Sequence, residues 1–306
     1  MTSTAATTEP GLSIVVVTWN SSATLAPLLA ELTGLDDVEI IVADNDSADD
    51  SLGVAAAAAP DAIRIRTGGN CGFAGGVNAG AAAATRDVLV LLNPDCVAGA
   101  DDLRHLADRV RGGLGIAAPR LTDASGAVTR SVRRRATVRD QFVVAAGLHK
   151  VSDRLDPDSD GGASTATVPV AVDVVSGACF ATPLALFREL GGLDERFFLY
   201  GEEVDYMVRV TEAGGRIEYD PGATVMHIGG TAADQVSTGT DFLLMESRVR
   251  WFHKHHGRVA AQFARVALAA WALRRRDRAA ISAMFRPMKK ILTPTHPRPK
   301  PVRVDE

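Results

Sequence analysis

The chain has 306 residues, of which 46% are hydrophobic and 23% charged, a globular composition with room for one large domain or one domain plus an appendage. No apolar run approaches the roughly 20 residues that a membrane-spanning helix needs, and residues 1–10 lack the basic and apolar regions of a signal peptide. The net charge is −4, but residues 248–306 contain 15 Lys and Arg against 3 Asp and Glu, so this basic tail is expected to meet an anionic partner.

Aliphatic runs alternate with helical patterns over the first 113 residues. Four runs bounded by polar or turn residues are expected to be buried strands: residues 12–18, 38–44, 62–66 and 88–92. Leucines spaced three and four apart predict a helix after the first strand, an Ala-rich segment predicts one near 74–85, and residues 101–113 repeat the helical spacing. This alternation predicts an α/β fold with a Rossmann-like, mostly parallel sheet, whose ligands bind beyond the carboxyl ends of the strands.

The second half of the chain is less regular. Residues 153–167 are polar and rich in Gly, Ser and Asp, so they are expected to form a mobile loop. The expected elements that follow are a strand at 172–180, a helix begun by Thr182-Pro183 and ended by Gly191-Gly192, a helix at 202–213, and a hairpin-like pair of short strands at 216–230 ending at His227. The predicted organisation is a disordered N-terminus at 1–10, one domain at 11–256, and an amphipathic helix with a basic tail at 257–306.

Two acidic residues follow strands of the predicted sheet. Asp44 stands in "VADNDS" and Asp95 in "NPDC", where Pro94 ends the strand and fixes the turn. Each acid alone is better explained as a helix cap or turn former. On neighbouring strand ends, however, the two carboxylates indicate a shared ligand, such as a divalent cation that bridges phosphates.

A glycine-rich turn leads into the predicted Ala-rich helix. In "TGGNCGFAGGVNAG" (67–80), bare backbone can approach a ligand, and the N-terminus of the helix favours anions. The stretch lacks the G-x-G-x-x-G spacing and follows the third strand, which disfavours a dinucleotide-binding dehydrogenase. It predicts a phosphate-binding loop, with a tight helix start as the structural alternative.

Acidic side chains crowd around aromatic residues in "LDERFFLYGEEVDYMVR". Glu202 and Glu203 open a helix, where the helix dipole favours their charge, and either is a candidate general base. Asp205 and Arg209 are spaced as a structural ion pair. His227 suits a metal site if it lies near Asp95.

The three cysteines, Cys71, Cys96 and Cys179, are odd in number and show no metal-binding spacing. They are expected to be reduced thiols of a cytosolic protein.

The order of these motifs resembles that of the nucleotide-sugar glycosyltransferases of family 2, which have the GT-A fold. The resemblance covers about residues 11–256 and rests on "VVVTWN", "VADNDS", "NCGFAGGVNAG", "LLNPD", "VSGACF", "GGLDERFFLYGEEVDYMVR", "MHIGG" and "RVRWFHKHHG". Within the family, the chain is most similar to the bacterial rhamnosyltransferases, including those that act on polyprenyl-diphosphate-linked N-acetylglucosamine in cell-wall linker synthesis.

The resemblance implies a role for each motif. Asp95 and His227 would hold a divalent cation, Mg²⁺ or Mn²⁺, while Asn93 replaces an acid that the family has there. Glu203 or Glu202 would be the base, where relatives commonly have Glu-Asp. The nucleotide sugar would contact Thr18, Asn20, Asp44, Asn70, Gly72, Phe73, Asn78, Asn93, Arg248 and Trp251, the last two lying near its diphosphate or near the acceptor.

The implied reaction is an inverting displacement that moves a sugar, L-rhamnose from dTDP-rhamnose, onto the lipid-linked acceptor. One alternative is another nucleotide sugar or glycan acceptor, and another is a nucleotide-sugar-binding module without turnover. A homodimer is compatible with this interpretation.

The C-terminal segment predicts where the protein acts. Phe263, Val266, Ala270 and Leu273 recur on one side of a helix that precedes an arginine cluster, so the tail is expected to bind an anionic membrane surface at the cytoplasmic face. The alternative is that this helix packs on the catalytic domain. Nucleic acid is not an expected partner, because the tail has few aromatic residues to stack on bases.

Overall fold

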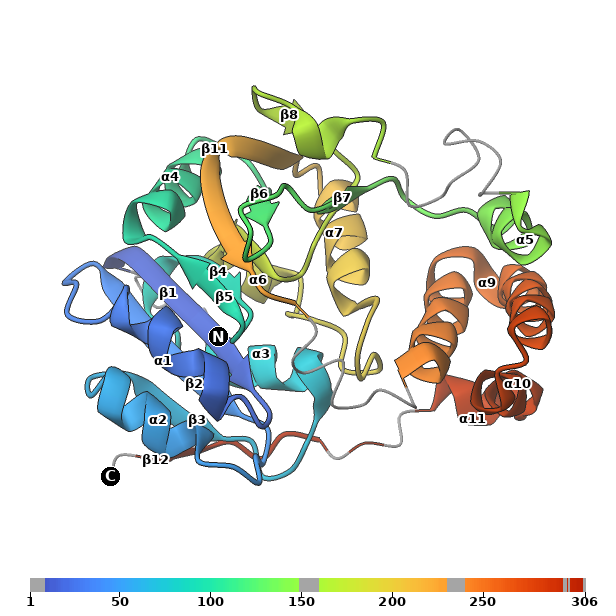
Figure 1. Ribbon diagram of the computed structural model, residues 1–306, viewed down its shortest axis with the longest axis horizontal. Coiled ribbons are helices and arrows are strands. Elements are labelled where there is room, and N and C mark those ends of the chain that lie inside the picture. Colours follow the sequence, from blue (N-terminus) through green and yellow to red (C-terminus); the bar gives the residue numbers. More distant parts are fainter. Residues whose placement is uncertain (1–8, 149–159, 230–239, 294–295, 297, 305–306) are drawn as a thin grey trace, which may run out of the picture.

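The computed structural model describes residues 9–148, 160–229, 240–293, 296 and 298–304, and it has the predicted α/β architecture (Figure 1). Its strands are β1 (Glu9–Thr18), β2 (Val38–Asp44), β3 (Ile63–Arg66), β4 (Arg86–Leu92), β5 (Cys96–Ala98), β6 (Ile116–Thr122), β7 (Val132–Arg133), β8 (Val170–Ala171), β9 (Val174–Val175), β10 (Cys179–Pro183), β11 (Ile217–His227) and β12 (Val302–Val304). Its helices are α1 (Ser22–Ala30), α2 (Ser51–Ala58), α3 (Gly72–Ala83), α4 (Ala100–Arg111), α5 (Val138–Ala146), α6 (Leu184–Glu189), α7 (Glu202–Glu212), α9 (Thr240–Arg275), α10 (Arg278–Phe285) and α11 (Met288–Leu292).

The main sheet has the strand order β12-β3-β2-β1-β4-β10-β6-β11-β5. Strands β1, β2, β3 and β4 are parallel, and Thr18 pairs with Asp44 where β1 and β2 end. The carboxyl end of β11 pairs with the short β5 in antiparallel register, so that His227 lies opposite Cys96. The strand ends that carry the predicted site residues therefore meet at one edge of the sheet.

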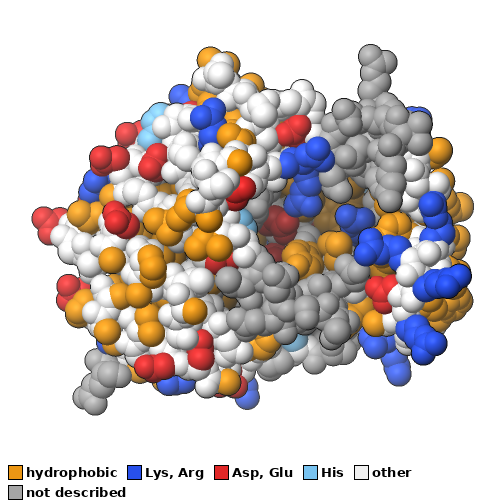
Figure 2. All heavy atoms as spheres, in the orientation of Figure 1, with side chains coloured by type: hydrophobic (Ala, Val, Ile, Leu, Met, Phe, Trp, Pro, Cys, Tyr) orange, Lys and Arg blue, Asp and Glu red, His pale blue; other side chains and the backbone are white. Residues whose placement is uncertain are grey.

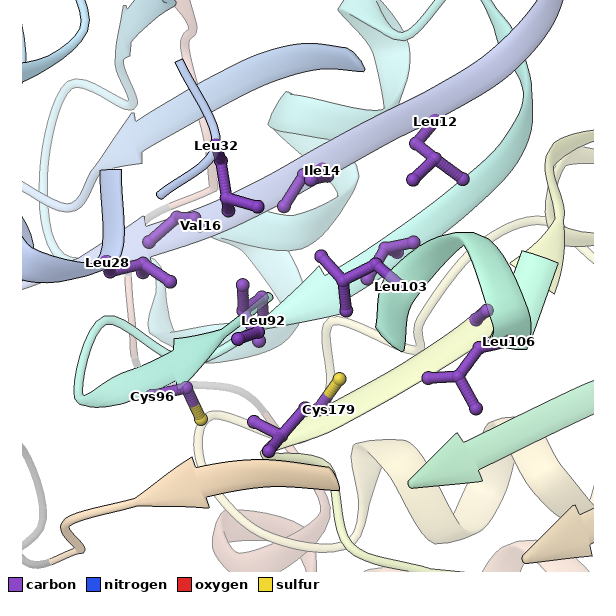
Figure 3. Packing of buried hydrophobic residues seen from close by; sticks show 14 of the residues in the cluster. Leu12, Ile14, Val16, Leu28, Leu32, Leu92, Cys96, Leu103, Leu106 and Cys179 are labelled. Atoms are coloured by element: carbon purple, nitrogen blue, oxygen red, sulfur yellow. The ribbon is translucent and has the colours of Figure 1, made fainter. Parts of the chain in front are cut away.

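The apolar core explains why the central strands have unbroken aliphatic sequences. Side chains alternate across β1, so Ile14 and Val16 join the cluster that includes Leu28 and Leu103, as Figure 3 shows. Val15 joins a second cluster on the opposite face, which α3, α6 and α7 help to form. A strand that is covered on both faces has no polar side, as is typical of parallel sheets.

The C-terminal helices form a third apolar cluster with α5 and with the loop and helix that precede β11. Phe252 and Leu268 of α9 are buried there together with Phe197 and Val208. Gly257 has φ +81 inside α9, which breaks the helix at the predicted boundary between 256 and 257. Within the described residues, no helix is both long and apolar enough to cross a membrane.

Three predicted elements differ from the structure. Residues 216–230 do not form a hairpin: β11 is one strand beside β6, and a register shift between Asp220 and Thr224 absorbs the Pro-Gly pair that suggested a turn. The strand predicted at 172–180 is divided between β9 and β10. Glu9 and Pro10, which were placed in the disordered N-terminus, begin β1.

The C-terminal tail and the polar loop also contain secondary structure that the sequence analysis did not predict. Residues 302–304 form the edge strand β12, which pairs with β3 in antiparallel register. Of the polar loop at 153–167, only residues 160–167 are described, and Ala163–Thr165 forms a 3₁₀ turn. Residues 1–8 lie outside the described part of the chain.

Candidate active site

A cavity of about 600 Å³ opens at the carboxyl ends of β1, β2 and β4. Figure 2 shows a hollow on this face between the sheet domain and the C-terminal helices, with acidic side chains inside it and basic side chains beside it. Of the predicted site residues, the cavity is lined by Asn70, Gly72, Phe73, Asn93, Asp95, Glu202, Glu203 and His227. A cavity at this place is expected for an α/β sheet, because strand ends supply polar groups without a covering helix.

Asp95 and His227 lie side by side although 131 residues lie between them in the sequence. The imidazole Nε2 of His227 lies 3.2 Å from Oδ1 of Asp95, and the Ile228 N–H donates to the Asp95 carbonyl oxygen. Asp95 is buried and His227 half-buried, and both line the cavity. A carboxylate oxygen and an imidazole nitrogen side by side form a ligand pair that suits a divalent cation such as Mn²⁺.

The Cys96 thiol is a third group at this point, which the spacing of the cysteines did not reveal. Its sulfur lies within 4.8 Å of the ligand atoms of Asp95 and His227. All three cysteines are free, as predicted. Burial raises the pKa of the Cys96 thiol well above its ordinary value, so that the group is neutral where it packs beneath Asp95.

The corner where β1 and β2 end is tied together by hydrogen bonds. The Thr18 hydroxyl donates to Oδ1 of the buried Asp44 at 2.9 Å, and Ser47 donates its N–H and hydroxyl to the same carboxylate. Asn20, with φ +52, accepts a bond from the Ala48 N–H and brackets this corner. Trp19, rather than Thr18 or Asp44, lines the cavity. The nucleoside contacts of Thr18, Asn20 and Asp44 remain predictions, and the structure shows these residues shaping the loop around Trp19.

The glycine-rich turn brings the start of α3 against the loop before α7. The Phe73 N–H donates to the Phe198 carbonyl oxygen, and a Cβ on Gly72 would lie 2.1 Å from that oxygen. Only glycine fits there, and Gly72 also has φ +77. Asn78 lies further along α3, where its side-chain amide donates to the Leu193 carbonyl oxygen and accepts from the Leu193 N–H. The contact of Asn78 with the donor remains a prediction. In the structure its side chain anchors the loop before α7 to α3.

Glu202 and Glu203 occupy the first turn of α7, which points at the cavity. Gly201, with φ +91, caps the helix, and its N–H donates to Oε2 of Glu203. Tyr200 has φ +69, a conformation that is uncommon for a bulky residue and concentrates at functional sites. Gly177 lies under Glu203, where an added Cβ would touch its side chain at 3.4 Å. The backbone on both sides thus fixes where the two carboxyl groups lie.

The two glutamates have different surroundings. Burial, followed by the charge of Glu203, raises the pKa of Glu202 well above its ordinary value, and Oε2 of Glu202 has no hydrogen-bond partner among the described residues. Glu203 instead lies 3.4 Å from the guanidinium of Arg133. The raised pKa therefore favours a protonated Glu202, whereas Glu203 is the glutamate that has a guanidinium beside it.

Asp205 holds α7 in place from behind. Its fully buried carboxylate is 2.9 Å from Arg209, as predicted from their spacing, and 2.6 Å from Lys254. His255 adds a third contact at 2.8 Å. Burial acts to raise the pKa of Asp205, but hydrogen bonds from His255 and Lys254 together with the charges of Arg209 and Lys254 lower it overall. These bonds connect the helix that carries Glu203 to α9.

A second, smaller cavity adjoins the first and contains Arg248 and Trp251 of α9. Arg133, Tyr200 and Glu203 line both cavities. Sequence analysis missed Arg133, because two arginines follow it and nothing in the pattern distinguishes one of the three. It also missed Phe198 and Tyr200 as lining residues, although both stand in the acidic motif that it singled out.

Comparisons with known proteins agree with this architecture. Residues 13–166 match the family described as glycosyl transferase family 2. The chain is 28% identical over 249 residues to N-acetylglucosaminyl-diphospho-decaprenol L-rhamnosyltransferase of Mycobacterium tuberculosis, which covers 71% of this chain and 75% of the relative. It is 27% identical over 204 residues to the low-salt glycan biosynthesis hexosyltransferase Agl10 of Haloferax volcanii, covering 65% of this chain and 61% of the relative.

Solved structures with a similar fold include GalNAc-T7 with UDP, GalNAc and Mn²⁺, at a TM-score of 0.58 and 16% identity over 92% of this chain and 56% of that one. They also include the mannosyltransferase PcManGT from Pyrobaculum calidifontis with GDP-Man and Mn²⁺, at a TM-score of 0.53 and 16% identity over 92% of this chain and 83% of that one. The chain belongs to glycosyl transferase family 2 and is a glycosyltransferase with the GT-A fold.

Proposed function

We propose that this glycosyltransferase moves L-rhamnose from dTDP-rhamnose to a polyprenyl-diphosphate-linked N-acetylglucosamine in cell-wall linker synthesis. The observation that carries the catalytic part is that Asp95 and His227 line the same cavity as Glu203. The donor and acceptor are inferred from the similarity to the mycobacterial rhamnosyltransferase. A binding module without turnover would not need a candidate base and a cation-binding pair in one cavity.

Asp95 and His227 would hold a divalent cation, Mg²⁺ or Mn²⁺. Their oxygen and nitrogen donors fit such an ion, and the Cys96 sulfur lies within 4.8 Å of both ligand atoms. The cation would supply charge neutralisation for the departing nucleoside diphosphate.

The residues of this chain supply the proton transfer. The ionised Glu203 takes the proton of an acceptor hydroxyl, whose oxygen forms a bond to the anomeric carbon as the bond from that carbon to the diphosphate breaks. Attack from the side opposite the leaving group inverts the anomeric configuration in one step. Glu202, whose raised pKa favours its protonated form, is not the base in this scheme.

The exposed face of α9 supports a peripheral position at the cytoplasmic side of the membrane. Phe263, Val266, Ala270 and Leu273 are all exposed, as a membrane-facing side requires, while Leu268 faces the core. Exposed basic residues lie next to them: Arg274, Arg275, Arg276 and Arg278. The other side of the helix packs on the protein, as the alternative from the sequence expected, so membrane contact is proposed for the exposed side only.

Replacement of Asp95 by Asn is expected to abolish transfer while leaving the fold intact. The change keeps the shape of the side chain and removes the charge that would hold the cation. Turnover would be measured against added Mg²⁺ or Mn²⁺, with the melting temperature as the control. Full activity in EDTA, or an active Asp95→Asn variant, would contradict the metal assignment.

Glu203→Gln is expected to lower kcat by about 10² or more with little change in donor binding, because it removes the general base. Glu202→Gln should lower kcat far less, since a neutral amide resembles the protonated carboxyl. Donor binding by calorimetry would show that both variants retain the site. The reverse ranking of the two variants would assign the base to Glu202.

The protonation of Glu202 predicts a pH-dependent stability. The folded state binds this proton more tightly than the unfolded chain, so stability should fall as pH rises above 4.5, the ordinary pKa of the group, by at most about 1.4 kcal/mol per pH unit. Glu202→Gln should therefore gain melting temperature relative to the wild type between pH 5 and pH 9. Glu212→Gln, an exposed change on the same helix, is the control. A gap that stays constant with pH would refute the raised pKa.

Binding to anionic liposomes is expected to depend on the exposed face of α9. Truncation near residue 258 would remove buried core residues such as Leu268, so point variants are the better test. Phe263→Ser with Val266→Ser should lower the partition coefficient onto phosphatidylglycerol vesicles by at least about tenfold, because full burial of each side chain contributes roughly 1.5–3 kcal/mol and even partial burial of both exceeds the roughly 1.4 kcal/mol of a tenfold change. Val128→Ser with Val168→Ser, exposed positions outside α9, should pellet as the wild type does. If both double variants pellet to the same extent, the proposal that α9 contacts the membrane is contradicted.

A further inference from the structure

The smaller cavity beside Glu203 is lined by three arginines among apolar side chains. It measures about 110 Å³, room for several water molecules and hence for a phosphate group. Arg133 and Arg134 line it from the segment between β7 and α5, and Arg248 lines it from α9. Guanidinium groups match the geometry of phosphate oxygens, so three of them around one small cavity favour a phosphate ligand.

Two of the three lining arginines have acidic neighbours. Arg133 lies near Glu203, and Arg134 lies 2.8 Å from Asp140. Arg135, the next residue along the chain, does not line the cavity but stands over the ring of Trp251 at 5.7 Å from its centroid. The segment that contains these arginines therefore packs against the indole of Trp251, which lines the same cavity as Arg248.

Two buried polar groups on the cavity wall lack a partner within the described part of the chain. The indole N–H of Trp251, a residue that is 5% exposed, donates to nothing, and Oε1 of Gln141, which is 3% exposed, accepts nothing. Buried polar atoms are nearly always hydrogen-bonded, and an indole N–H can only donate. A ligand oxygen in the cavity would satisfy it, and a flip of the Gln141 amide would offer a further donor.

The position of this cavity relative to Glu203 separates it from the donor site. Glu203 lines both cavities, whereas Asp95 and His227 line only the larger one. A general base must lie beside the acceptor hydroxyl whose proton it takes, so a phosphate group held next to Glu203 and away from Asp95 and His227 is assigned to the acceptor. The exposed Phe142 follows Gln141 on α5, and its ring centroid lies 6.3 Å from that of Phe263 on α9. An apolar chain that leaves the cavity along α5 therefore meets apolar surface.

We propose that Arg133, Arg134, Arg248 and the Trp251 indole bind the diphosphate of a lipid-linked acceptor, so that its sugar reaches Glu203 and its lipid leaves over Phe142 and Phe263. This assignment rests on the proposed function in one respect, namely that the acceptor is a lipid-linked diphosphate sugar.

Binding without turnover tests the site directly. Calorimetry with geranyl diphosphate in EDTA, without donor, should show binding to the wild type that Arg133→Gln and Trp251→Phe each weaken by about tenfold, since each removes a hydrogen bond to a charged group. Arg139→Gln, an exposed charge on α5, should bind as the wild type does. Inorganic pyrophosphate should bind more weakly than geranyl diphosphate. Equal binding by all variants would overturn the site, and equal affinity for pyrophosphate would overturn its lipid-linked occupant.

Kinetics distinguish this proposal from the proposed function. With a short-chain prenyl-diphospho-N-acetylglucosamine as acceptor, Trp251→Phe should raise the acceptor KM about tenfold and leave the donor KM unchanged. With octyl N-acetylglucosaminide, an acceptor that has no diphosphate, the same substitution should leave the acceptor KM unchanged. If transfer to the diphosphate acceptor occurs and Trp251→Phe leaves its KM unchanged, the site is wrong and the function stands. If no acceptor is used but geranyl diphosphate binding depends on Arg133 and Trp251, the function is wrong and the site stands.

Discussion

The antiparallel pairing of β5 with β11 is the contact on which the proposed cation site depends. The three-residue β5 pairs with β11 so that Cys96 lies opposite His227. Just beyond this pair, the Ile228 N–H donates a hydrogen bond to the carbonyl oxygen of Asp95. These bonds place a carboxylate from the turn after β4 against an imidazole from the end of β11. The aliphatic sequence of β4 serves the same end, because a strand packed on both faces gives the turn at Pro94 a rigid base.

The second fixed point is Asp205. A buried carboxylate left without its partners is strongly destabilising, so Lys254 and His255 of α9 hold α7 in place, while Arg209 pairs with Asp205 within α7. The helix that carries Glu203 is thereby connected to the helix whose exposed face is proposed to meet the membrane. The C-terminal helices thus take part in positioning the base, and they also supply part of the wall of the smaller cavity.

Local sequence signals predicted β1, α1, β2, β3, α3, β4 and α4, but not α2 or β5. They also singled out Asp95, Glu203 and His227, because strand ends and helix starts are marked by neighbouring residues. Contacts between distant segments were beyond such signals. The approach of Cys96 to His227 and of Arg133 to Glu203 depends on how β5, β7 and α7 pack. The turn-like "DPG" sequence gave a false hairpin, because a register shift can accommodate Pro and Gly within one strand.

The central claim is that this cavity catalyses sugar transfer to a lipid-linked diphosphate acceptor. The most direct measurement is acceptor-dependent release of nucleoside diphosphate by the purified full-length protein, with a matrix of nucleotide sugars against polyprenyl-diphospho-N-acetylglucosamine. The account predicts that dTDP-rhamnose gives the highest rate and that mass spectrometry finds one deoxyhexose added to the acceptor. Release that does not depend on the acceptor, or a clear preference for another nucleotide sugar, would contradict it.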